Sequence, residues 1–455
     1  MSSFTLADLP RAAGLLLWCG ALLAPAHASP VLQASKLDSW PQVHGDAANS
    51  GLSASSASPI DAAGSTAFPA YGSTAAVLSS PVAAYGRLYY GDLDGKLYCL
   101  SAATMDLLWS HVPVSFAPDP SIRATPAVAA GRVYSIARDR QLRCFDALTG
   151  APIFTVGLGT AWNLSGPGLG LPGWIDPSPT VHAGVVYVAA RDGRVRAFDA
   201  ATGASLWDVP LDPGEFTVST PAVLESGGST FVYVNALSDR NRVVCLDAAN
   251  GDEVWSEVLV TADGQVPRRG WGSIAVGYVG SSPRLVLGTD PPPTADPAEF
   301  YVFCLFALKQ HGLPQRAWSF DIGQGTEACF ITATPAIHAG WIYLPTGRGL
   351  FRLGLANPSA PGWYGVGFPS HHTNAWASAA VAVRPGPTPD GTPYVYYVSN
   401  EGSANGLICR RASDGAQMWR WGFPSGMHVS SPAVLGGRVF AGQTNGKMLS
   451  IFGSH

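Results

Sequence analysis

The stretch PSPTVHAGVVYVAARDGRVRAFDAATGASLW, from Pro177 to Trp207, contains one complete structural unit of this chain. Its apolar or alternating runs predict four β-strands, which begin near Thr180, Val185, Arg194 and Ser205. Turn sequences separate these runs at Ala183-Gly184, Arg191-Asp192-Gly193 and Asp199 to Gly203. Glycine adopts positive φ without a steric penalty, and aspartate side chains bond to nearby backbone amides, so each sequence favours a tight turn. The stretch therefore predicts four short antiparallel strands joined by three hairpins.

This unit recurs along most of the chain. Its copies start at Ser80-Pro81, Thr125-Pro126, Ser178-Pro179, Thr220-Pro221, Ser273-Ile274, Thr334-Pro335, Ser378-Ala379 and Ser431-Pro432, at spacings of 45, 53, 42, 53, 61, 44 and 53 residues. Repeats of this length that consist of short strands are typical of β-propellers. No sustained helical periodicity is present. We therefore predict an all-β protein, an eight-bladed β-propeller of four-stranded antiparallel blades.

The tryptophan near the end of most copies is a large, flat side chain. It occurs as Trp109, Trp207, Trp255, Trp318 and Trp419. We expect these rings to pack between neighbouring blades.

The last copy, Ser431 to Phe452, stops after three predicted strands. An open blade leaves unpaired backbone groups at its edge. We expect a strand from the N-terminal region to complete this blade and close the ring. The predicted closing strand lies around Trp40-Pro41-Gln42-Val43, and Ser53 to Val77 is the predicted irregular link into blade 1.

The strand endings resemble those of a known family. Three copies contain Asp-Ala-x-x-Gly, at Asp146 to Gly150, Asp199 to Gly203 and Asp247 to Gly251, and a Ser-Pro-Ala-Val opening occurs at Ser431 to Val434. These motifs resemble the pyrroloquinoline-quinone-like (PQQ-like) eight-bladed β-propellers, over about residues 79–455 and also at Trp40-Pro41-Gln42. The family includes both dehydrogenases and non-catalytic propellers, so the resemblance implies the fold without deciding the activity.

The first 28 residues have the features of a secretory signal peptide. Arg11 provides a positive charge, residues 12–24 are apolar, and Ala26-His27-Ala28 is a small-x-small cleavage site. An uncleaved anchor is the alternative. We predict a signal peptide at residues 1–28, a closing strand and linker at 29–78 and the propeller at 79–455, in a monomeric periplasmic or secreted bacterial protein without a membrane span.

Composition and cysteine placement exclude several classes of function. Charged residues make up 13% of the chain, with 27 Lys+Arg against 31 Asp+Glu, which argues against nucleic-acid binding and against electrostatic membrane docking. Five cysteines occupy the same place in the predicted third strand, namely Cys99, Cys144, Cys245, Cys304 and Cys409. We interpret them as buried core thiols, although export also permits disulfides.

The loops between blades are where the sequence departs most from the repeat, and we expect them to line one face of the central channel. Their candidate binding residues are Arg123, Trp162, Asn163, Trp174, Arg268, Arg269, Trp271, Asn374 and Trp376, and their candidate catalytic carboxylates are Asp176 and Glu327. Arginines bind anionic ligands, tryptophans stack on flat rings, and carboxylates act as bases or metal ligands. The ordinary alternatives are tryptophans that plug the channel and arginines that pair with turn aspartates such as Asp139 and Asp192.

The resemblance to PQQ-like enzymes implies a possible cofactor, pyrroloquinoline quinone (PQQ) with Ca²⁺. In that reading Arg123, Arg268 or Arg269 holds the quinone, and Asp176 or Glu327 is the base or metal ligand for oxidation of an alcohol or sugar. The chain differs from the family's alcohol dehydrogenases, because it has no adjacent cysteine pair and no Arg-Pro-Gly-Asp-Asn-type segment. We therefore favour a binding or scaffold protein of the cell envelope with a protein or peptide partner, and keep a quinoprotein dehydrogenase with a small-molecule substrate as the alternative.

Overall fold

The computed structural model describes twenty stretches of the chain. They are residues 42, 45–50, 52–53, 64–68, 76–112, 119–159, 176–238, 241–261, 264, 266, 272–289, 301–312, 314–322, 333–346, 349–359, 362, 380–382, 393–399, 405–423 and 430–452. The chain divides into residues Met1–Val31, which include the predicted signal peptide and lie outside the described residues, and Leu32–His455. All structural statements concern the second unit. Its described part contains only β-strands, and no helix there is long and apolar enough to cross a bilayer.

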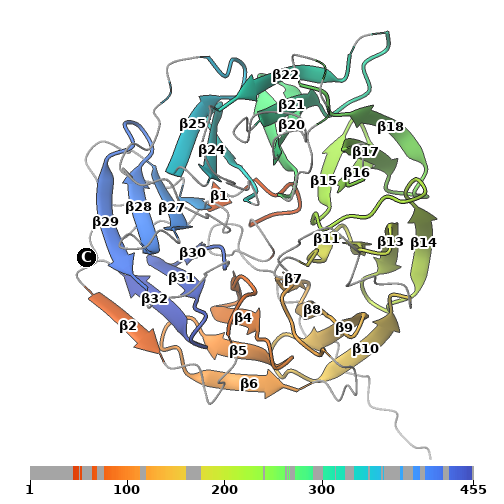
Figure 1. Cartoon of the computed structure of the whole chain (residues 1–455). Coiled ribbons are helices and arrows are strands. Elements are labelled where there is room, and N and C mark those ends of the chain that lie inside the picture. Colours follow the sequence, from red (N-terminus) through yellow and green to blue (C-terminus); the bar gives the residue numbers. More distant parts are fainter. Residues whose placement is uncertain are drawn as a thin grey trace, which may run out of the picture. The chain divides into compact units, whose positions relative to one another are not determined.

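The first four blades are complete four-stranded antiparallel sheets (Figure 1). Blade 1 contains β3 (Val82–Ala84), β4 (Arg87–Gly91), β5 (Leu97–Ser101) and β6 (Leu107–His111). Blade 2 contains β7 (Ala127–Ala129), β8 (Arg132–Ala137), β9 (Gln141–Asp146) and β10 (Pro152–Gly157). Blade 3 contains β11 (Thr180–His182), β12 (Val185–Ala189), β13 (Arg194–Asp199) and β14 (Ser205–Pro210). Blade 4 contains β15 (Ala222–Ser226), β16 (Ser229–Ala236), β17 (Arg242–Asp247) and β18 (Glu253–Val258).

The other four blades complete the ring. Blade 5 contains β19 (Ala275–Val279), β20 (Ser282–Thr289), β21 (Tyr301–Phe306) and β22 (Arg316–Asp321). Blade 6 contains β23 (Ala336–His338), β24 (Trp341–Thr346) and β25 (Gly349–Gly354) within the described residues. Blade 7 contains β26 (Ala380–Ala382), β27 (Tyr394–Ser399), β28 (Gly406–Arg411) and β29 (Gln417–Gly422), and its inner edge also carries β1 (Leu52–Ser53). Blade 8 contains β30 (Ala433–Leu435), β31 (Arg438–Gly442), β32 (Met448–Phe452) and β2 (Gly64–Phe68).

The structure confirms the eight-bladed propeller and its closure by an N-terminal strand, but it corrects which segment closes the ring. The closing strand is β2, which pairs antiparallel with β32 from Gly64↔Phe452 to Phe68↔Met448. This strand lies inside the stretch that we expected to be an irregular link. Gln42, from the segment predicted to close the ring, instead accepts a hydrogen bond from the Val181 amide at the inner edge of blade 3. The unpaired backbone groups of an open strand edge are thus satisfied in two ways, by the paired strand β2 in blade 8 and by the Gln42 side chain in blade 3.

Tryptophans on the outer strands bind the next blade, as predicted. The Nε1–H groups of Trp109, Trp207, Trp255 and Trp318 donate to backbone carbonyls of the following blade, at 2.9–3.1 Å. The acceptors are Ala147, Ala248, Ala307 and Leu355. A Cβ atom on Gly150 would lie 2.6 Å from the Trp109 ring, so the glycine of the Asp-Ala-x-x-Gly turn makes room for the indole. The tryptophan of one blade and the glycine turn of the next blade therefore pack together and join the two blades.

In the described copies, the Ser/Thr residue at the start forms a second contact between blades. The backbone amide of Ser80 donates to the Thr125 hydroxyl, the Thr125 amide to Ser178, and the series continues through Thr220, Ser273 and Thr334 at 2.9–3.2 Å. At the closure the Ser431 amide donates to the Ser80 hydroxyl at 2.8 Å. This arrangement explains why Ser273 keeps the hydroxyl although isoleucine replaces the usual proline after it.

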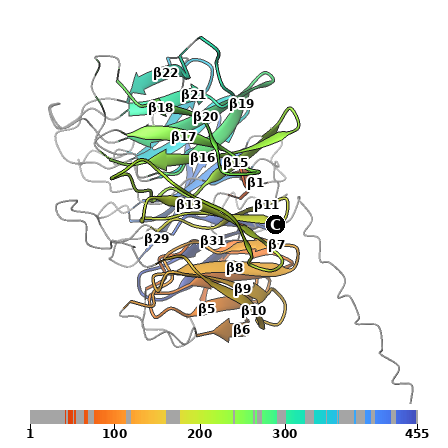
Figure 2. The ribbon, with the colours of Figure 1, turned by 90° about the vertical axis from the view of Figure 1, so that its right-hand side faces the viewer.

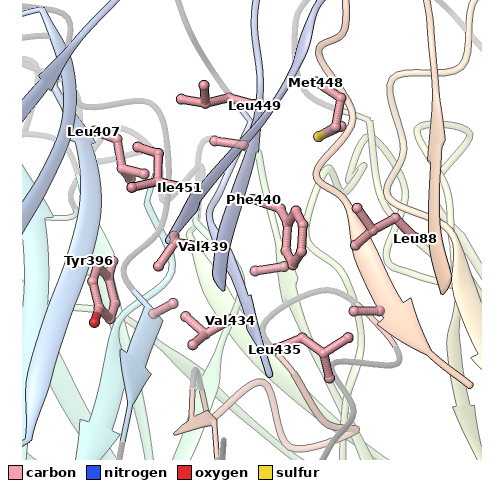
Figure 3. Packing of buried hydrophobic residues seen from close by; sticks show 14 of the residues in the cluster. Leu88, Tyr396, Leu407, Val434, Leu435, Val439, Phe440, Met448, Leu449 and Ile451 are labelled. Atoms are coloured by element: carbon pink, nitrogen blue, oxygen red, sulfur yellow. The ribbon is translucent and has the colours of Figure 1, made fainter. Parts of the chain in front are cut away.

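The ring closure has a continuous apolar core. One buried cluster combines residues of blades 7, 8 and 1, including Tyr396, Phe440 and Leu88, which are all fully buried. Figure 3 shows the Phe440 ring of β31 beside Leu88 of β4, with Tyr396 on the blade 7 side. Figure 2 shows the ring from the side. Burial of large side chains on both flanks of blade 8 stabilises the closure in addition to the pairing of β2.

The five predicted core cysteines are free and buried in the third strand of their blades. Burial raises the pKa of Cys99 to about 11 and that of Cys144 and Cys304 to about 12. At pH 8 the thiolate fraction of each is therefore about one in a thousand or less. We expect iodoacetamide at pH 8 to leave peptides with these three cysteines unmodified in the native protein and to alkylate them in urea, as measured by mass spectrometry. Rapid native labelling would contradict the burial.

The turns between the first and second strands contain strained alanines. Ala130, Ala183 and Ala339 have φ of 47–48°, a left-handed conformation that costs an L-residue about 1 kcal/mol. Asparagine tolerates this conformation better, so Ala183→Asn is expected to increase the free energy of unfolding by about 0.5–1 kcal/mol. Urea denaturation measures the change. Ala201→Asn, at an exposed turn position without positive φ, is the control that should show no gain.

Candidate functional site: a buried arginine–aspartate cluster

Two of the eleven predicted site residues, Arg123 and Asp176, belong to the described part of the chain. The remaining predictions lie outside the described residues, namely Trp162, Asn163, Trp174, Arg268, Arg269, Trp271, Glu327, Asn374 and Trp376. Their proposed roles stay predictions.

The fold places Arg123 and Asp176 in one cluster with Asp119, Arg138 and Arg191, here called the Arg/Asp cluster. Asp119 and Arg123 come from the connection between blades 1 and 2, and Asp176 from the connection into blade 3. Arg138 follows β8 and Arg191 follows β12, at the turns into the third strands. The cluster therefore forms where interblade connections meet turns between second and third strands.

Asp176 is the centre of the cluster. Its Oδ2 lies 2.8 Å from Arg138 Nε, and its Oδ1 lies 3.3 Å from Arg191 Nε. Only 3% of the Asp176 side chain is exposed, with 5% for Arg191 and 9% for Arg138. Two guanidinium groups thus neutralise one buried carboxylate, which is the usual condition for burying a charge.

Arg138 connects this buried part to a more accessible part. Its Nη1 lies 3.2 Å from Asp119 Oδ2, and the same oxygen lies 3.6 Å from Arg123 Nη2. Arg123 also donates from Nε to the Ser121 hydroxyl at 3.1 Å. The exposed fraction rises to 15% at Arg123 and 34% at Asp119. The cluster therefore extends from the protein interior to a partly solvated edge.

The shifts in pKa follow from burial and crowding of charge. Burial, and then repulsion by Arg138, lowers the pKa of Arg123. Burial alone would raise the pKa of the Asp119 carboxyl, but hydrogen bonds from Ser121 and Arg138 outweigh it and lower that pKa. Burial likewise opposes protonation of Arg138, yet attraction to Asp176 raises its pKa. The cluster combines three arginines with two aspartates, so its formal charge has an excess of one positive charge.

This charge balance suits anion recognition better than base catalysis. The adjoining loop sequences 113–118 and 160–175 contain no aspartate or glutamate that would offset the positive excess. Asp176 already contacts two guanidinium groups, whose positive charges oppose the approach of Ca²⁺ to its carboxylate. Arg123 fits a role in holding a carboxylate of PQQ. Among the described residues no group of three or more His, Cys, Asp or Glu side chains is arranged to bind a metal ion.

Sequence reasoning missed Asp119, Arg138 and Arg191. A signal for the two arginines was present, because Ala137-Arg138-Asp139 and Ala190-Arg191-Asp192 occupy the same position in consecutive copies. In both copies the aspartate pairs with an arginine four residues later, Asp139 with Arg143 and Asp192 with Arg196. Asp139 and Asp192 thus pair with arginines of their own third strands, whereas the predicted loop arginine Arg123 contacts Asp119. The arginines that precede these aspartates, Arg138 and Arg191, contact Asp176.

Comparison with known proteins places the chain in a family. A family model described as "Outer membrane protein assembly factor BamB" matches residues 47–271. The chain is a PQQ-like β-propeller. The outer membrane protein assembly factor BamB of Moranella endobia (strain PCIT) is 39% identical over 89 residues of this propeller. That match covers 19% of this chain and 22% of the relative.

Solved structures share the fold of this PQQ-like propeller at low sequence identity. A europium-containing methanol dehydrogenase has a TM-score of 0.65 at 13% identity, over 90% of this chain and 91% of its own. A quinohemoprotein alcohol dehydrogenase from Comamonas testosteroni has 0.61 at 16% identity, over 93% and 82%. BamB from Moraxella catarrhalis has 0.54 at 12% identity, over 86% and 97%. Dehydrogenases and an assembly factor therefore share this architecture.

Proposed function

We propose that this PQQ-like propeller is an exported binding protein of the bacterial cell envelope that acts as a scaffold in outer-membrane protein assembly. The proposal is supported by the description of the family model that matches residues 47–271 and by the name of the relative that is 39% identical over 89 residues. One observation in the site favours this binding role over a catalytic role. Asp176, the described candidate base, is already engaged by Arg138 and Arg191.

The binding surface in this proposal is the partly exposed edge of the Arg/Asp cluster. Arg123 and Asp119 carry the partly exposed charged groups of this edge. Arg138 contacts Asp119, and Asp176 in turn contacts Arg138 in the interior. A protein partner that brings an acidic side chain to this edge gains charge-assisted hydrogen bonds from pre-positioned guanidinium groups. The propeller contributes a rigid frame and no chemistry of its own.

In-cell crosslinking tests the scaffold function. A photo-crosslinking amino acid at Asp119 is expected to form an adduct with an outer-membrane protein or a component of its assembly machinery, identified by mass spectrometry. The same amino acid at Ala201, an exposed residue in the turn after β13, is the matched control and should give no such adduct. Absence of the adduct from periplasmic and membrane fractions would contradict the proposal.

The alternative function is a quinoprotein dehydrogenase. It is favoured by one observation, which is that Arg123 and Asp176 lie in the same cluster, as a site for an anionic quinone requires. Addition of PQQ and Ca²⁺ to the mature protein, followed by absorbance and thermal-shift measurements, distinguishes the two functions. A bound-quinone spectrum with a raised melting temperature that Arg123→Ala abolishes would favour the dehydrogenase. An unchanged melting temperature at a large excess of quinone is the result expected for the scaffold.

A further inference from the structure

An N-terminal segment runs along the inner edges of five consecutive blades. This segment, here called the belt, consists of the described residues 42, 45–50 and 52–53. Gln42 Oε1 accepts from the Val181 amide of blade 3 at 2.9 Å. The carbonyls of Ala47, Ala48 and Ser50 accept from the amides of Val223, Val276 and Ile337 in blades 4, 5 and 6, at 2.6–2.9 Å. In blade 7 Leu52 and Ser53 pair parallel with Val381 and Ala382 (β1 in Figure 1).

The blade edges that contact the belt are equivalent in the five blades. Val181, Val223, Val276, Ile337 and Val381 each occupy the third position after the Ser or Thr that starts the copy. Each lies on the innermost strand, whose other edge is already paired with the second strand of its blade. The repeat therefore presents equivalent backbone N–H groups on the inner edges of these blades. The belt supplies one acceptor each to blades 3, 4, 5 and 6 in order, and it pairs as a short strand with blade 7.

Side chains fix the register of the belt. The Asn49 carboxamide donates to the Ile274 carbonyl at 3.0 Å and lies 3.4 Å from the carbonyls of Thr220 and Pro221, so it connects blades 4 and 5. Asn49 is fully buried and has φ of 53°, which asparagine tolerates better than most residues. Asp46 caps the turn by accepting from the Ser50 amide at 2.9 Å and from its hydroxyl at 2.5 Å.

The belt is bound as a peptide ligand is bound. Its described side chains between Gly45 and Ser50 are small or polar, and none is a large apolar anchor. Three of its hydrogen bonds to the blades join backbone groups, and β1 pairs with β26, as when an extended peptide is added to the open edge of a sheet. Such hydrogen bonds replace bonds to water, so each contributes little net free energy. Ala47 and Ala48 of the belt pack at the margin of apolar clusters that are otherwise formed by residues of the blades.

We propose that the inner edges of blades 3 to 7 form a binding site for an extended peptide with small side chains, and that residues 42–53 are its resident, exchangeable ligand. The peptide that this site recognises has two consecutive small residues followed by an asparagine, as in Ala47-Ala48-Asn49. The site is separate from the Arg/Asp cluster, so the inference does not depend on the proposed function.

The test uses the full chain with a protease recognition sequence inserted between Ser58 and Pro59, in the link between the belt and β2. The folded protein is cleaved and mixed with an excess of a fluorescent peptide of residues 40–53. Size-exclusion chromatography and native mass spectrometry follow the two ligands, and circular dichroism follows the fold. The expected result is a folded propeller in which one labelled peptide has replaced the N-terminal fragment.

Three results would overturn the proposal. They are loss of the fold on cleavage, departure of the fragment without uptake of the peptide, and retention of the fragment until the propeller unfolds. A matched peptide with Asn49→Ala lacks the carboxamide that connects blades 4 and 5, and it is expected to compete at least ten-fold more weakly. Equal competition by both peptides would show adhesion to another surface and would also contradict the site.

Discussion

Replacement of Asp176 by alanine is expected to lower the free energy of unfolding by about 3–5 kcal/mol, because it leaves the buried guanidinium groups of Arg138 and Arg191 without their shared carboxylate. Truncation of one partner in a buried ion pair leaves an uncompensated charge in a medium of low polarity. The loss is measured by urea denaturation at pH 7, as a lower midpoint with an unchanged slope.

Asp208→Ala is the matched control for this prediction. Asp208 also contacts two arginines, Arg194 at 2.6 Å and Arg196 at 3.3 Å, but 39% of its side chain is exposed. Solvent screens such a pair, so the expected loss is below about 1 kcal/mol. Similar losses for the two variants would show that burial of the Arg/Asp cluster contributes little to stability. If the Asp176→Ala protein keeps its stability but loses the crosslink formed from position 119, Asp176 contributes to partner binding and not to stability.

Deletion of residues 29–68 is expected to remove most of the stability of the propeller. The deletion takes away the belt and β2, whose five register pairs close blade 8. If each backbone hydrogen bond contributes about 1 kcal/mol net, the loss is on the order of 5 kcal/mol, which is a large part of the stability of a typical domain. We expect a lower melting temperature and a broadened transition in calorimetry.

A shorter deletion distinguishes the stability contributed by the belt and β2 from that contributed by the preceding N-terminal residues. Removal of residues 29–41 keeps both the described belt and β2, and it is expected to leave the melting temperature within a few degrees of the full chain. If the two deletions unfold at the same temperature as the full chain, β2 does not hold the ring closed. In that case the apolar core around Phe440 and Leu88 would be sufficient for closure.

Local features of the repeat predicted much of the fold correctly. In blade 3 the strands expected to begin at Val185, Arg194 and Ser205 begin there in the structure, and the turn at Ala183-Gly184 has positive φ at both residues. These features depend on a few consecutive residues, so a sequence displays them directly. The burial of Cys99 and its equivalents was predictable for the same reason, since strand alternation decides which side chains face the neighbouring blade.

Partners that are distant in the sequence were harder to predict. The closing strand was expected at Trp40 to Val43 and proved to be Gly64–Phe68, because pairing with an open edge uses backbone groups that every segment carries. In the candidate site Arg123 and Asp176 were identified, but Arg138 and Arg191 were not. Their role depends on the approach of turns from different blades, and the repeat makes them look like ordinary turn residues.

The amino-acid sequence by itself determined the number of blades, the four-stranded unit and the packing of tryptophans between blades, because strand alternation and turn chemistry act over a few residues. Only the tertiary structure decided which N-terminal segment closes blade 8, which one lies along the inner edges, and which arginines neutralise Asp176. Backbone N–H and C=O groups are the same in every residue, so an open edge accepts many segments, and the packing of the whole ring selects among them.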